Sequence, residues 1–364
     1  MQDIAISQLL QQLQMTPAEA NTLWFADENS YSALGALTPY MHNLTVLTNR
    51  FDIYQQAQTL GLKSVFNDVD FTAACPVATD AVFMRISKEK AVTHHAINQA
   101  VNTLSLHGQL HLAGYKNEGI KTYAQKAATL FNHSSKLKKQ KDSHICSLSH
   151  PKAAAHTELL DSSHYTQLRT IGEYAGKQLV SKPGVFGYEK IDDGSQLLLE
   201  SAQVFLSQHA CIHTQARTLD LGCGYGLLAM TAHQWGLQHI TATDNNAAAL
   251  SAIRAGAAQN NININVIAAD AGKGITDTFD IILCNPPFHQ GFEVSGDLTD
   301  KFLRNASQLL AKNGCALFVV NSFIAIEKKA LSIFKYQKTL CNNKQFKVVL
   351  LANNELLTPN ANTQ

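Results

Sequence analysis

The segment Asn285-Pro286-Pro287-Phe288 follows an apolar run at residues 281–284. Its two prolines fix φ and lack an amide N–H, so the loop is rigid and its carbonyl groups remain available as acceptors. The Asn285 amide offers donors and an acceptor, and Phe288 can stack on a planar ring. Such a segment can hold a planar amino group with its nitrogen aimed at an electrophile, which suits methyl transfer to an exocyclic or amide nitrogen. A rigid turn without chemistry is the alternative.

A cluster of glycines lies upstream of this segment and reads Asp220-Leu221-Gly222-Cys223-Gly224-Tyr225-Gly226. Glycine lets the backbone turn tightly and approach a ligand closely at the switch point of an open sheet. The pattern is G-x-G-x-G and not the dinucleotide fingerprint G-x-G-x-x-G, because Leu227 stands where the last glycine would be. The cluster therefore predicts a ligand site but argues against a nicotinamide-dependent dehydrogenase.

Acidic residues are predicted at three successive strand ends, at Asp220, Asp244 and Asp270. An ionised carboxylate is an acceptor only, so Asp244 can accept from both hydroxyls of a ribose. Asp270, or a backbone group beside it, can receive the exocyclic amine of an adenine. A helix N-cap or a turn is the alternative for Asp270.

The C-terminal half supplies the sheet edge that these residues need. Strands are predicted at 218–221, 240–244, 266–270, 279–284 and 316–320, alternating with helices at 227–235, 247–259, 298–310 and 327–334. Alternation of this kind, with nearly continuous apolar strands, predicts a parallel sheet covered on both faces. A closing strand at 346–351, paired with one near 337–340, has no helix before it and should be antiparallel.

The N-terminal half shows a less regular alternation of predicted strands and helices. Strands are predicted at 43–47, 81–86 and 109–112, with helices at 51–60, 90–104 and 120–130. The strand-helix-Gly-strand order matches that of the C-terminal half, which predicts a degenerate duplication, with two unrelated α/β domains as the alternative. The boundary is expected in a polar stretch, giving domains at 1–160 and 161–364.

One basic cluster stands out in the N-terminal half, at Lys136, Lys138, Lys139 and Lys141. We expect a solvated helix end there, with an RNA-contacting patch as the alternative.

Composition excludes several classes of protein. The chain has 364 residues, of which 45% are hydrophobic and 16% charged, and its net charge is +1. These values exclude a disordered chain and a surface that attracts nucleic acid everywhere. No apolar run approaches the roughly 18 residues of a membrane span, and the N-terminus does not read as a signal peptide. Scattered cysteines without C-x-x-C, and histidines without ligand spacing, predict a cytoplasmic protein that binds no metal.

The glycine cluster and the Asn-Pro-Pro-Phe segment together resemble class I S-adenosylmethionine-dependent N-methyltransferases. His289 extends the second motif to N-P-P-F-H, and the segments at 182–186 and 192–199 narrow the resemblance to ribosomal RNA guanine-N2 methyltransferases of the RsmC/RlmG type. The resemblance implies an α/β protein with two tandem class I methyltransferase-like (Rossmann-like) domains. The N-terminal domain is degenerate, and the C-terminal one is a seven-stranded, mostly parallel sheet with an antiparallel closing strand.

The resemblance also assigns roles to residues of this sequence. Cofactor contacts are implied at Asp220, Gly222, Cys223, Gly224, Gly226, Asp244, Asn245, Asp270 and Asn285. Catalytic positions are implied at Asn285, Pro286, Pro287 and Phe288, and substrate contacts at Phe186, Gln196, Phe288 and His289. In the N-terminal copy the place of the tetrapeptide reads Arg85-Ile86-Ser87-Lys88, and no glycine cluster follows its first predicted strand. That copy should bind neither cofactor nor methyl acceptor, and its implied role is to support the catalytic domain and to help grip RNA.

The expected reaction moves a methyl group from S-adenosylmethionine to N2 of a guanine in 16S ribosomal RNA of the small subunit, leaving S-adenosylhomocysteine. The expected partner is that RNA, and the protein is expected to be a monomer that binds neither metal nor membrane. The segments at 184–186 and 194–199 favour the small subunit, whereas those at 285–290 and 342–344 are equally similar to the large-subunit enzyme acting on 23S RNA. A protein glutamine N5-methyltransferase is a further alternative, although Phe288 stands where that class has Tyr. An RNA-binding protein that has lost catalysis is the non-enzymatic alternative.

Overall fold

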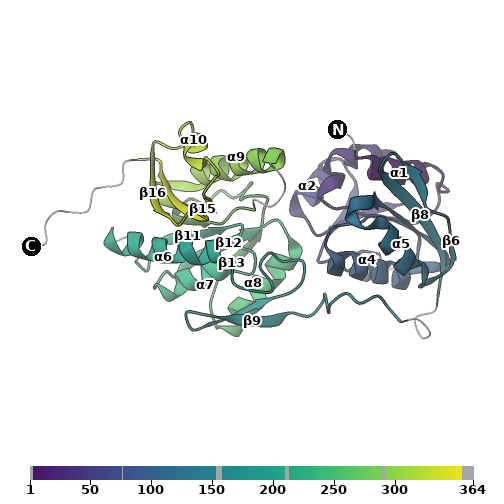
Figure 1. Cartoon of the computed structure of the whole chain (residues 1–364), viewed down its shortest axis with the longest axis horizontal. Coiled ribbons are helices and arrows are strands. Elements are labelled where there is room, and N and C mark those ends of the chain that lie inside the picture. Colours follow the sequence, from purple (N-terminus) through teal and green to yellow (C-terminus); the bar gives the residue numbers. More distant parts are fainter. Residues whose placement is uncertain (1–2, 76, 153–157, 210–212, 288–291, 355–364) are drawn as a thin grey trace, which may run out of the picture. The chain divides into compact units, whose positions relative to one another are not determined.

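A computed structural model of the chain describes residues 3–75, 77–152, 158–209, 213–287 and 292–354, with side chains omitted at 292–297. The chain divides into two compact units, Met1–Gln167 and Leu168–Gln364 (Figure 1). The first unit extends past residue 160, where the boundary was expected, because Tyr165 is fully buried in its core. The Tyr165 hydroxyl donates to Asp68 at 2.7 Å, and its ring stacks on His95.

The second unit contains a seven-stranded sheet in the order β13-β12-β11-β14-β15-β17-β16. Its strands are β11 (Arg217–Leu221), β12 (His239–Asp244), β13 (Asn265–Ala268), β14 (Phe279–Cys284), β15 (Leu310–Asn321), β16 (Tyr336–Asn342) and β17 (Phe346–Ala352). Strands β11 to β15 run parallel, and β17 is antiparallel to both β15 and β16. This confirms the predicted fold class and the antiparallel closing strand.

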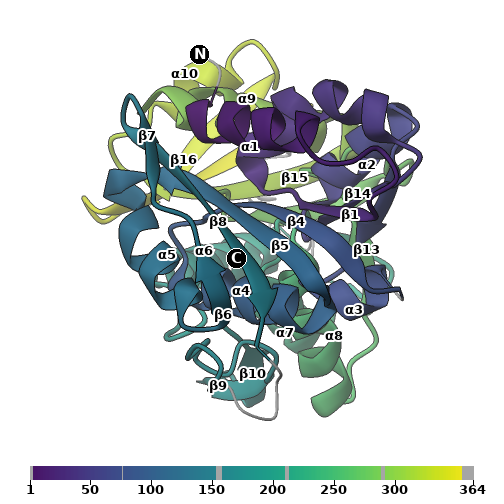
Figure 2. The same cartoon turned by 90° about the vertical axis from the view of Figure 1, so that its right-hand side faces the viewer.

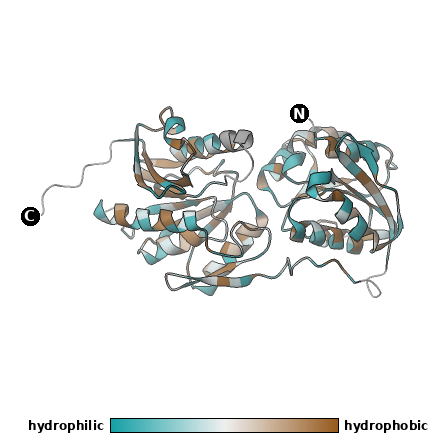
Figure 3. Cartoon of the chain, viewed as in Figure 1, coloured by the Kyte–Doolittle hydropathy of each residue, from teal (hydrophilic) through white to brown (hydrophobic). Residues whose placement is uncertain are grey.

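Helices cover both faces of this sheet. They are α6 (Asp193–Gln208), α7 (Leu227–Gln234), α8 (Ala247–Gln259), α9 (Phe292–Leu309) and α10 (Ile326–Ala330), and a hairpin of β9 (Arg169–Tyr174) and β10 (Lys177–Ser181) precedes them. One apolar cluster joins the sheet to α6, α7 and α8, and a second joins it to α9 and α10. Figure 3 shows hydrophobic residues concentrated along the strands.

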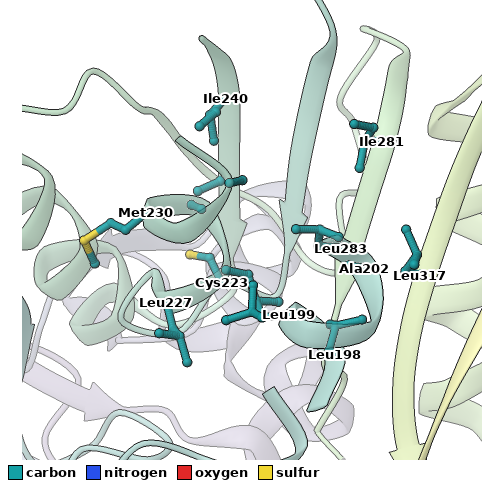
Figure 4. Packing of buried hydrophobic residues seen from close by; sticks show 14 of the residues in the cluster. Leu198, Leu199, Ala202, Cys223, Leu227, Met230, Ile240, Ile281, Leu283 and Leu317 are labelled. Carbon is teal, nitrogen blue, oxygen red and sulfur yellow. The ribbon is translucent and has the colours of Figure 1, made fainter. Parts of the chain in front are cut away.

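The contact of α6 with the sheet has a direct role at the site, because α6 begins beside the loop that follows β14. Leu198, Leu199 and Ala202 pack in one cluster with Leu283 of β14 and Leu317 of β15 (Figure 4). Burial of a leucine side chain contributes about 1.5–3 kcal/mol, so these residues hold the start of α6 firmly in place.

The first unit repeats the same strand order, β3-β2-β1-β4-β5-β8-β6, with β7 added on β8. Its strands are β1 (Thr22–Phe25), β2 (Leu44–Thr48), β3 (Lys63–Phe66), β4 (Thr79–Arg85), β5 (Leu104–Tyr115), β6 (Phe131–Ser134), β7 (Lys138–Gln140) and β8 (Ser143–Pro151). Its helical segments are α1 (Ile4–Gln14), η1 (Glu28–Tyr40), α2 (Phe51–Thr59), α3 (Phe71–Ala74), α4 (Lys90–Thr103), η2 (Lys116–Glu118) and α5 (Ile120–Ala128). Helices α1 and α2 pack on one face, and α3, α4 and α5 on the other (Figure 2). The predicted duplication of the architecture is confirmed.

Three details of the sequence-based prediction were wrong. The first strand of the N-terminal sheet is β1, which was not predicted; the strand expected at 43–47 is β2 and corresponds to β12 of the second unit. The basic cluster is not a helix end, because Lys138 and Lys139 belong to β7, which pairs with β8. Strand β13 ends at Ala268, so Asp270 lies two residues beyond it.

No helix in the described part of the chain is long and apolar enough to cross a membrane.

Candidate functional site

The loop after β11 is built on glycine conformations. Gly222, Gly224 and Gly226 have φ values of +81°, +53° and +90°, in the left-handed region that side chains with a Cβ adopt rarely. A Cβ built on Gly226 would lie 2.5 Å from Ile253 of α8, so glycine is required for packing there. A Cβ on Gly224 would meet nothing within 4 Å, so the loop leaves open space at this point where a ligand can approach the backbone.

Hydrogen bonds tie the glycine loop to the end of β12. The Cys223 amide donates to the Thr243 carbonyl at 2.9 Å, and the Gly224 amide donates to Asp244 Oδ2 at 2.9 Å. Asp244 Oδ1 accepts from the Asn246 amide at 2.8 Å, so both oxygens of the Asp244 carboxylate have backbone partners. The half-buried Asp244 side chain is thereby held in one orientation beside the loop.

Asp220 lies beneath the glycine loop and is fully buried. Its Oδ2 accepts from the Ala229 amide in α7 at 2.9 Å, whereas its Oδ1 has no hydrogen-bond partner among the described residues. Burial raises the pKa of Asp220 to about 7, and the nearby Asp244 carboxylate adds to the increase. A buried carboxylate of this kind favours a positive charge placed close to it.

Asn285 follows β14 directly and is held by the start of α6. Its Nδ2 donates to Asp192 Oδ2 at 2.9 Å and to Ser195 Oγ at 2.8 Å. With both N–H groups engaged, Oδ1 is the atom that the amide can offer to an incoming donor. Pro286 is buried and Pro287 exposed.

Asp192 and Ser195 are the site residues whose roles sequence reasoning missed. Asp192 caps α6, since its Oδ2 accepts from the Ser195 amide at 2.8 Å. The signal in the sequence was an acidic residue before the apolar run at 197–199, which predicts a helix start. Nothing in that signal indicates a contact with Asn285, which lies 93 positions further along the chain.

The upstream segment reaches the same edge of the sheet. The Asn246 side chain caps α8 and also donates to the Gly184 carbonyl at 3.0 Å, which brings residues 184–186 beside the end of β12. Phe186 is 55% exposed, and Gln196 is half-buried in the first turn of α6.

The remaining predicted residues are placed as follows. Asn245 is half-buried between the Asp244 carboxylate and the cap of α8. Asp270 is half-buried and forms an ion pair with Lys301 of α9. Phe288 and His289 lie outside the described residues. The structure therefore gathers most of the predicted positions at the carboxyl ends of β11, β12 and β14.

A cavity of about 560 Å³ lies elsewhere in the second unit. It is lined by the turn between β9 and β10, by α6 beyond Leu198, and by the last turn of α7. None of the predicted site residues lines it, so we place the chemistry at the sheet edge and not in this cavity. Among the described residues, no group of three or more His, Cys, Asp or Glu side chains could hold a metal ion.

Comparisons with known proteins agree with this geometry. A family model described as methyltransferase small domain matches residues 176–350, and its N-terminal companion matches residues 7–167. The chain belongs to the methyltransferase small domain family. It is a methyltransferase whose two domains correspond to the two units of the fold.

Related proteins carry the name ribosomal RNA small subunit methyltransferase C. The one from Erwinia tasmaniensis is 29% identical over 262 residues, which are 72% of this chain and 72% of the relative. The one from Aeromonas hydrophila is 28% identical over 317 residues, which are 86% of this chain and 88% of the relative. Among solved structures, a T. thermophilus 16S rRNA N2 methyltransferase (RsmC) in complex with AdoMet and guanosine has a TM-score of 0.81 at 22% identity. The match covers 97% of this chain and 92% of the other, and it supports the fold.

The residues at the sheet edge fit S-adenosylmethionine, the methyl donor expected from the sequence. Its sulfonium and ammonium groups are positively charged, and a cation of this kind would favour the ionised form of the buried Asp220 carboxyl group, whose Oδ1 has no hydrogen-bond partner among the described residues. The open space above Gly224 admits a ligand, and the Asp244 carboxylate at the end of β12 is an acceptor whose chemistry suits ribose hydroxyls.

Proposed function

We propose that this protein transfers a methyl group from S-adenosylmethionine to the exocyclic N2 of a specific guanine in 16S ribosomal RNA. The observation that carries the proposal is the fixed amide of Asn285 beside the glycine loop, because that amide presents Oδ1 as an acceptor for a planar amine. The names of the relatives support ribosomal RNA of the small subunit as the substrate. The reaction would take place in the cytoplasm, where ribosomal subunits are available.

S-adenosylmethionine supplies an electrophilic methyl carbon when it is bound. Asn285 Oδ1 and the Pro286 carbonyl accept the two N–H groups of the guanine amine, which turns the nitrogen lone pair out of the ring plane and toward that carbon. Because the nitrogen needs orientation and no strong base, positioning supplies most of the acceleration. The amine nitrogen would accept the methyl group that the cofactor supplies, S-adenosylhomocysteine would be left, and the amine proton would pass to solvent.

Other residues keep the roles that the sequence suggested. Gly222, Cys223, Gly224 and Gly226 would surround the methionine part of the cofactor, with Asp220 beneath them. Asp244 and Asn245 would hold the ribose, and Asp270 the adenine. Pro287 would stiffen the catalytic loop, Phe288 would stack on the guanine, and Phe186, Gln196 and His289 would border the base.

Among the described residues of the N-terminal unit, an ionic network stands at the end of β4 in place of a comparable site. Arg85 is 5% exposed there and forms ion pairs with Asp3 at 3.0 Å, Asp27 at 3.8 Å and Glu118 at 2.8 Å. Its guanidinium and these carboxylates occupy the place that corresponds to the catalytic loop. We therefore propose that the first unit, Met1–Gln167, binds neither cofactor nor methyl acceptor, and that it supports the catalytic unit, Leu168–Gln364, and helps to bind RNA.

The test is to incubate the purified protein with S-adenosylmethionine carrying a labelled methyl group. Small subunits, large subunits and naked ribosomal RNA from a strain lacking the gene serve as separate substrates. Labelled N2-methylguanosine from 16S RNA is the expected result, and label in 23S RNA would favour the large-subunit alternative. Absence of label in RNA despite cofactor binding would contradict the proposal and favour a protein amide as acceptor.

The variant Asn285→Ala distinguishes an enzyme from an RNA-binding protein that has lost catalysis. An enzyme carrying this change should still bind cofactor but lose turnover.

A further inference from the structure

Phe323 is the most exposed phenylalanine among the described residues. It is 71% exposed and follows β15 by two positions, in the loop before α10. Phe186 is 55% exposed, and it is the only other exposed phenylalanine in the described part of the chain. Both phenylalanines lie at the edge where the parallel strands end, which is the edge that carries the catalytic loop.

Phe323 stands on a loop that is held from both sides. The Ser322 amide donates to the Gln345 carbonyl at 2.9 Å, and the Ser322 hydroxyl donates to Asn342 Oδ1 at 3.2 Å. The Ile324 amide donates to the Asn321 carbonyl at 2.9 Å. The exposed ring is therefore carried by an ordered backbone, which lowers the entropic cost of using it as a binding surface.

Contacts connect this loop to Asn285. Phe346 pairs with Asn321 at the end of β15, and a Cβ built on Gly194 would lie 3.3 Å from the Phe346 ring. Gly194 directly precedes Ser195, whose hydroxyl accepts from Asn285. The catalytic amide and the Phe323 loop are thus separated by the first turn of α6 and the start of β17.

Lys344 is a cationic residue on the turn between β16 and β17, the turn that holds the Phe323 loop. Lys344 is exposed and has φ +74°, and its amide donates to Asn342 Oδ1 at 3.0 Å. Asn343 Oδ1 accepts from the Gln345 amide at 3.1 Å and from the Phe346 amide at 2.7 Å, so the turn is well ordered. The two loops are joined by hydrogen bonds, and each carries an exposed group. The ring is of the kind that stacks on a base, and the ammonium is of the kind that contacts a phosphate.

We propose that Phe323 and Lys344 form a second nucleotide subsite, which takes a nucleotide adjacent to the target guanine in the substrate RNA. Phe323 stacks on the base of that nucleotide, and Lys344 contacts its phosphate. The proposal rests on the proposed function. A target guanine must leave its stack to reach Asn285, and a neighbouring base that stacks on protein offsets part of that cost. Because every base has a π-face, this subsite binds without selecting a sequence.

The experiment compares Phe323→Ala, Phe323→Trp and Lys344→Gln with the wild type in two assays. The first assay measures kcat and KM for methylation of the ribosomal substrate. The second measures how strongly guanosine, and a trinucleotide with guanine in the middle, compete for the site. Val204→Ala is the matched control, since Val204 is 59% exposed on α6 of the same unit.

If the subsite exists, the trinucleotide should compete more strongly than guanosine for the site of the wild-type protein. Phe323→Ala should raise KM by about 5- to 100-fold and remove that advantage, with guanosine competition unchanged. Phe323→Trp should retain the stronger competition by the trinucleotide. Lys344→Gln should raise KM mainly at low salt. An unchanged KM in Phe323→Ala, with normal methylation by the wild type, would overturn the subsite alone. If the wild type methylates no guanine, the proposed function fails and the subsite fails with it.

Discussion

Asn285 has a defined orientation because its amide donors meet two acceptors at the start of α6. A free asparagine amide rotates easily and presents its oxygen and nitrogen about equally. The Asp192 carboxylate accepts only, so it selects the Nδ2 side, and the Ser195 hydroxyl completes the pair. In the proposed reaction, orientation of this one amide would be the main contribution that the protein makes to aiming a planar amine.

Removing one of these acceptors should impair catalysis without affecting cofactor binding. Ser195→Ala deletes one hydrogen bond to Asn285, worth about 1–1.5 kcal/mol, and kcat should fall about tenfold. The measurement is single-turnover methylation together with titration of S-adenosylmethionine. Ser207→Ala, at the exposed end of the same helix, is the control. An unchanged kcat in Ser195→Ala would contradict the positioning role.

The buried carboxylate of Asp220 makes the stability of the second unit depend on pH. Its pKa is raised to about 7 in the fold, against 3.8 for an ordinary aspartate. The folded state therefore holds a proton that the unfolded chain releases, and folding is progressively disfavoured as pH rises from about 4 to about 7. The cost above pH 7 is on the order of 4 kcal/mol.

Asp220→Asn removes this titration. The free energy of unfolding of the variant, relative to the wild type, should increase between pH 5 and pH 8 by a few kcal/mol. Urea unfolding followed by Trp235 fluorescence, in a Trp24→Phe background, reports on this unit. The same variant should bind S-adenosylmethionine more weakly, because a negative charge beneath the cation is lost. A stability difference that does not change with pH would show that Asp220 does not titrate in this range.

At the scale of elements, the glycine loop combines two constraints. Gly224 leaves space for a ligand, whereas Gly226 lets α7 start against α8. The first constraint concerns binding and the second concerns folding, although both positions have positive φ.

Gly226→Ala should destabilise the second unit by about 2–4 kcal/mol, because it adds a clash with Ile253 to the strain of a positive φ. The matched control is Gly236→Ala, which has φ +96° and no atom within 4 Å of the added Cβ. The control should cost about 1 kcal/mol, from the backbone alone. Denaturant unfolding measures both, and equal losses would mean that the contact with Ile253 relaxes.

In the molecule as a whole, the two units share one architecture but carry different residues at the corresponding edge of the sheet. The strand orders of the two sheets correspond, yet β4 ends in Arg85 where β14 ends in Cys284. In the first unit the corresponding edge is filled by an ionic network, and in the second it carries the glycine and Asn-Pro-Pro loops. We therefore expect that these internal contacts leave no ligand site at that edge of the first unit.

Arg85→Met should destabilise the first unit by about 3–5 kcal/mol, since Asp3, Asp27 and Glu118 lose their shared cation. Fluorescence of Trp24, which stacks on Phe83, follows unfolding of this unit in a Trp235→Phe background. Lys90→Met, which breaks the exposed pair with Asp161, should leave the stability of the first unit nearly unchanged. Binding of S-adenosylmethionine should be unchanged in both variants; a large loss in Arg85→Met would indicate that the first unit contributes to the cofactor site.

Features that depend on neighbouring residues could be predicted from the order of amino acids alone. Alternation of apolar strands and helices predicted the second sheet and its antiparallel closing strand. This works because the spacing of apolar residues along the chain reflects which faces of each element are buried. Glycines at 222, 224 and 226 and the Asn-Pro-Pro segment indicated the site for the same reason, since backbone conformation is a local property. The four residues of β1 gave too short a pattern, so the first strand of the N-terminal sheet was missed.

Contacts between groups far apart in the chain became visible only in the folded protein. The fold buried Asp220 beneath the loop, paired Asp270 with Lys301, and brought Asp192 and Ser195 against Asn285. The physical reason is that these contacts join residues far apart in the chain and depend on how α6 and α9 pack on the sheet. Packing also sets the solvation that shifts a pKa, so the protonation of Asp220 could not be deduced from its position in the sequence.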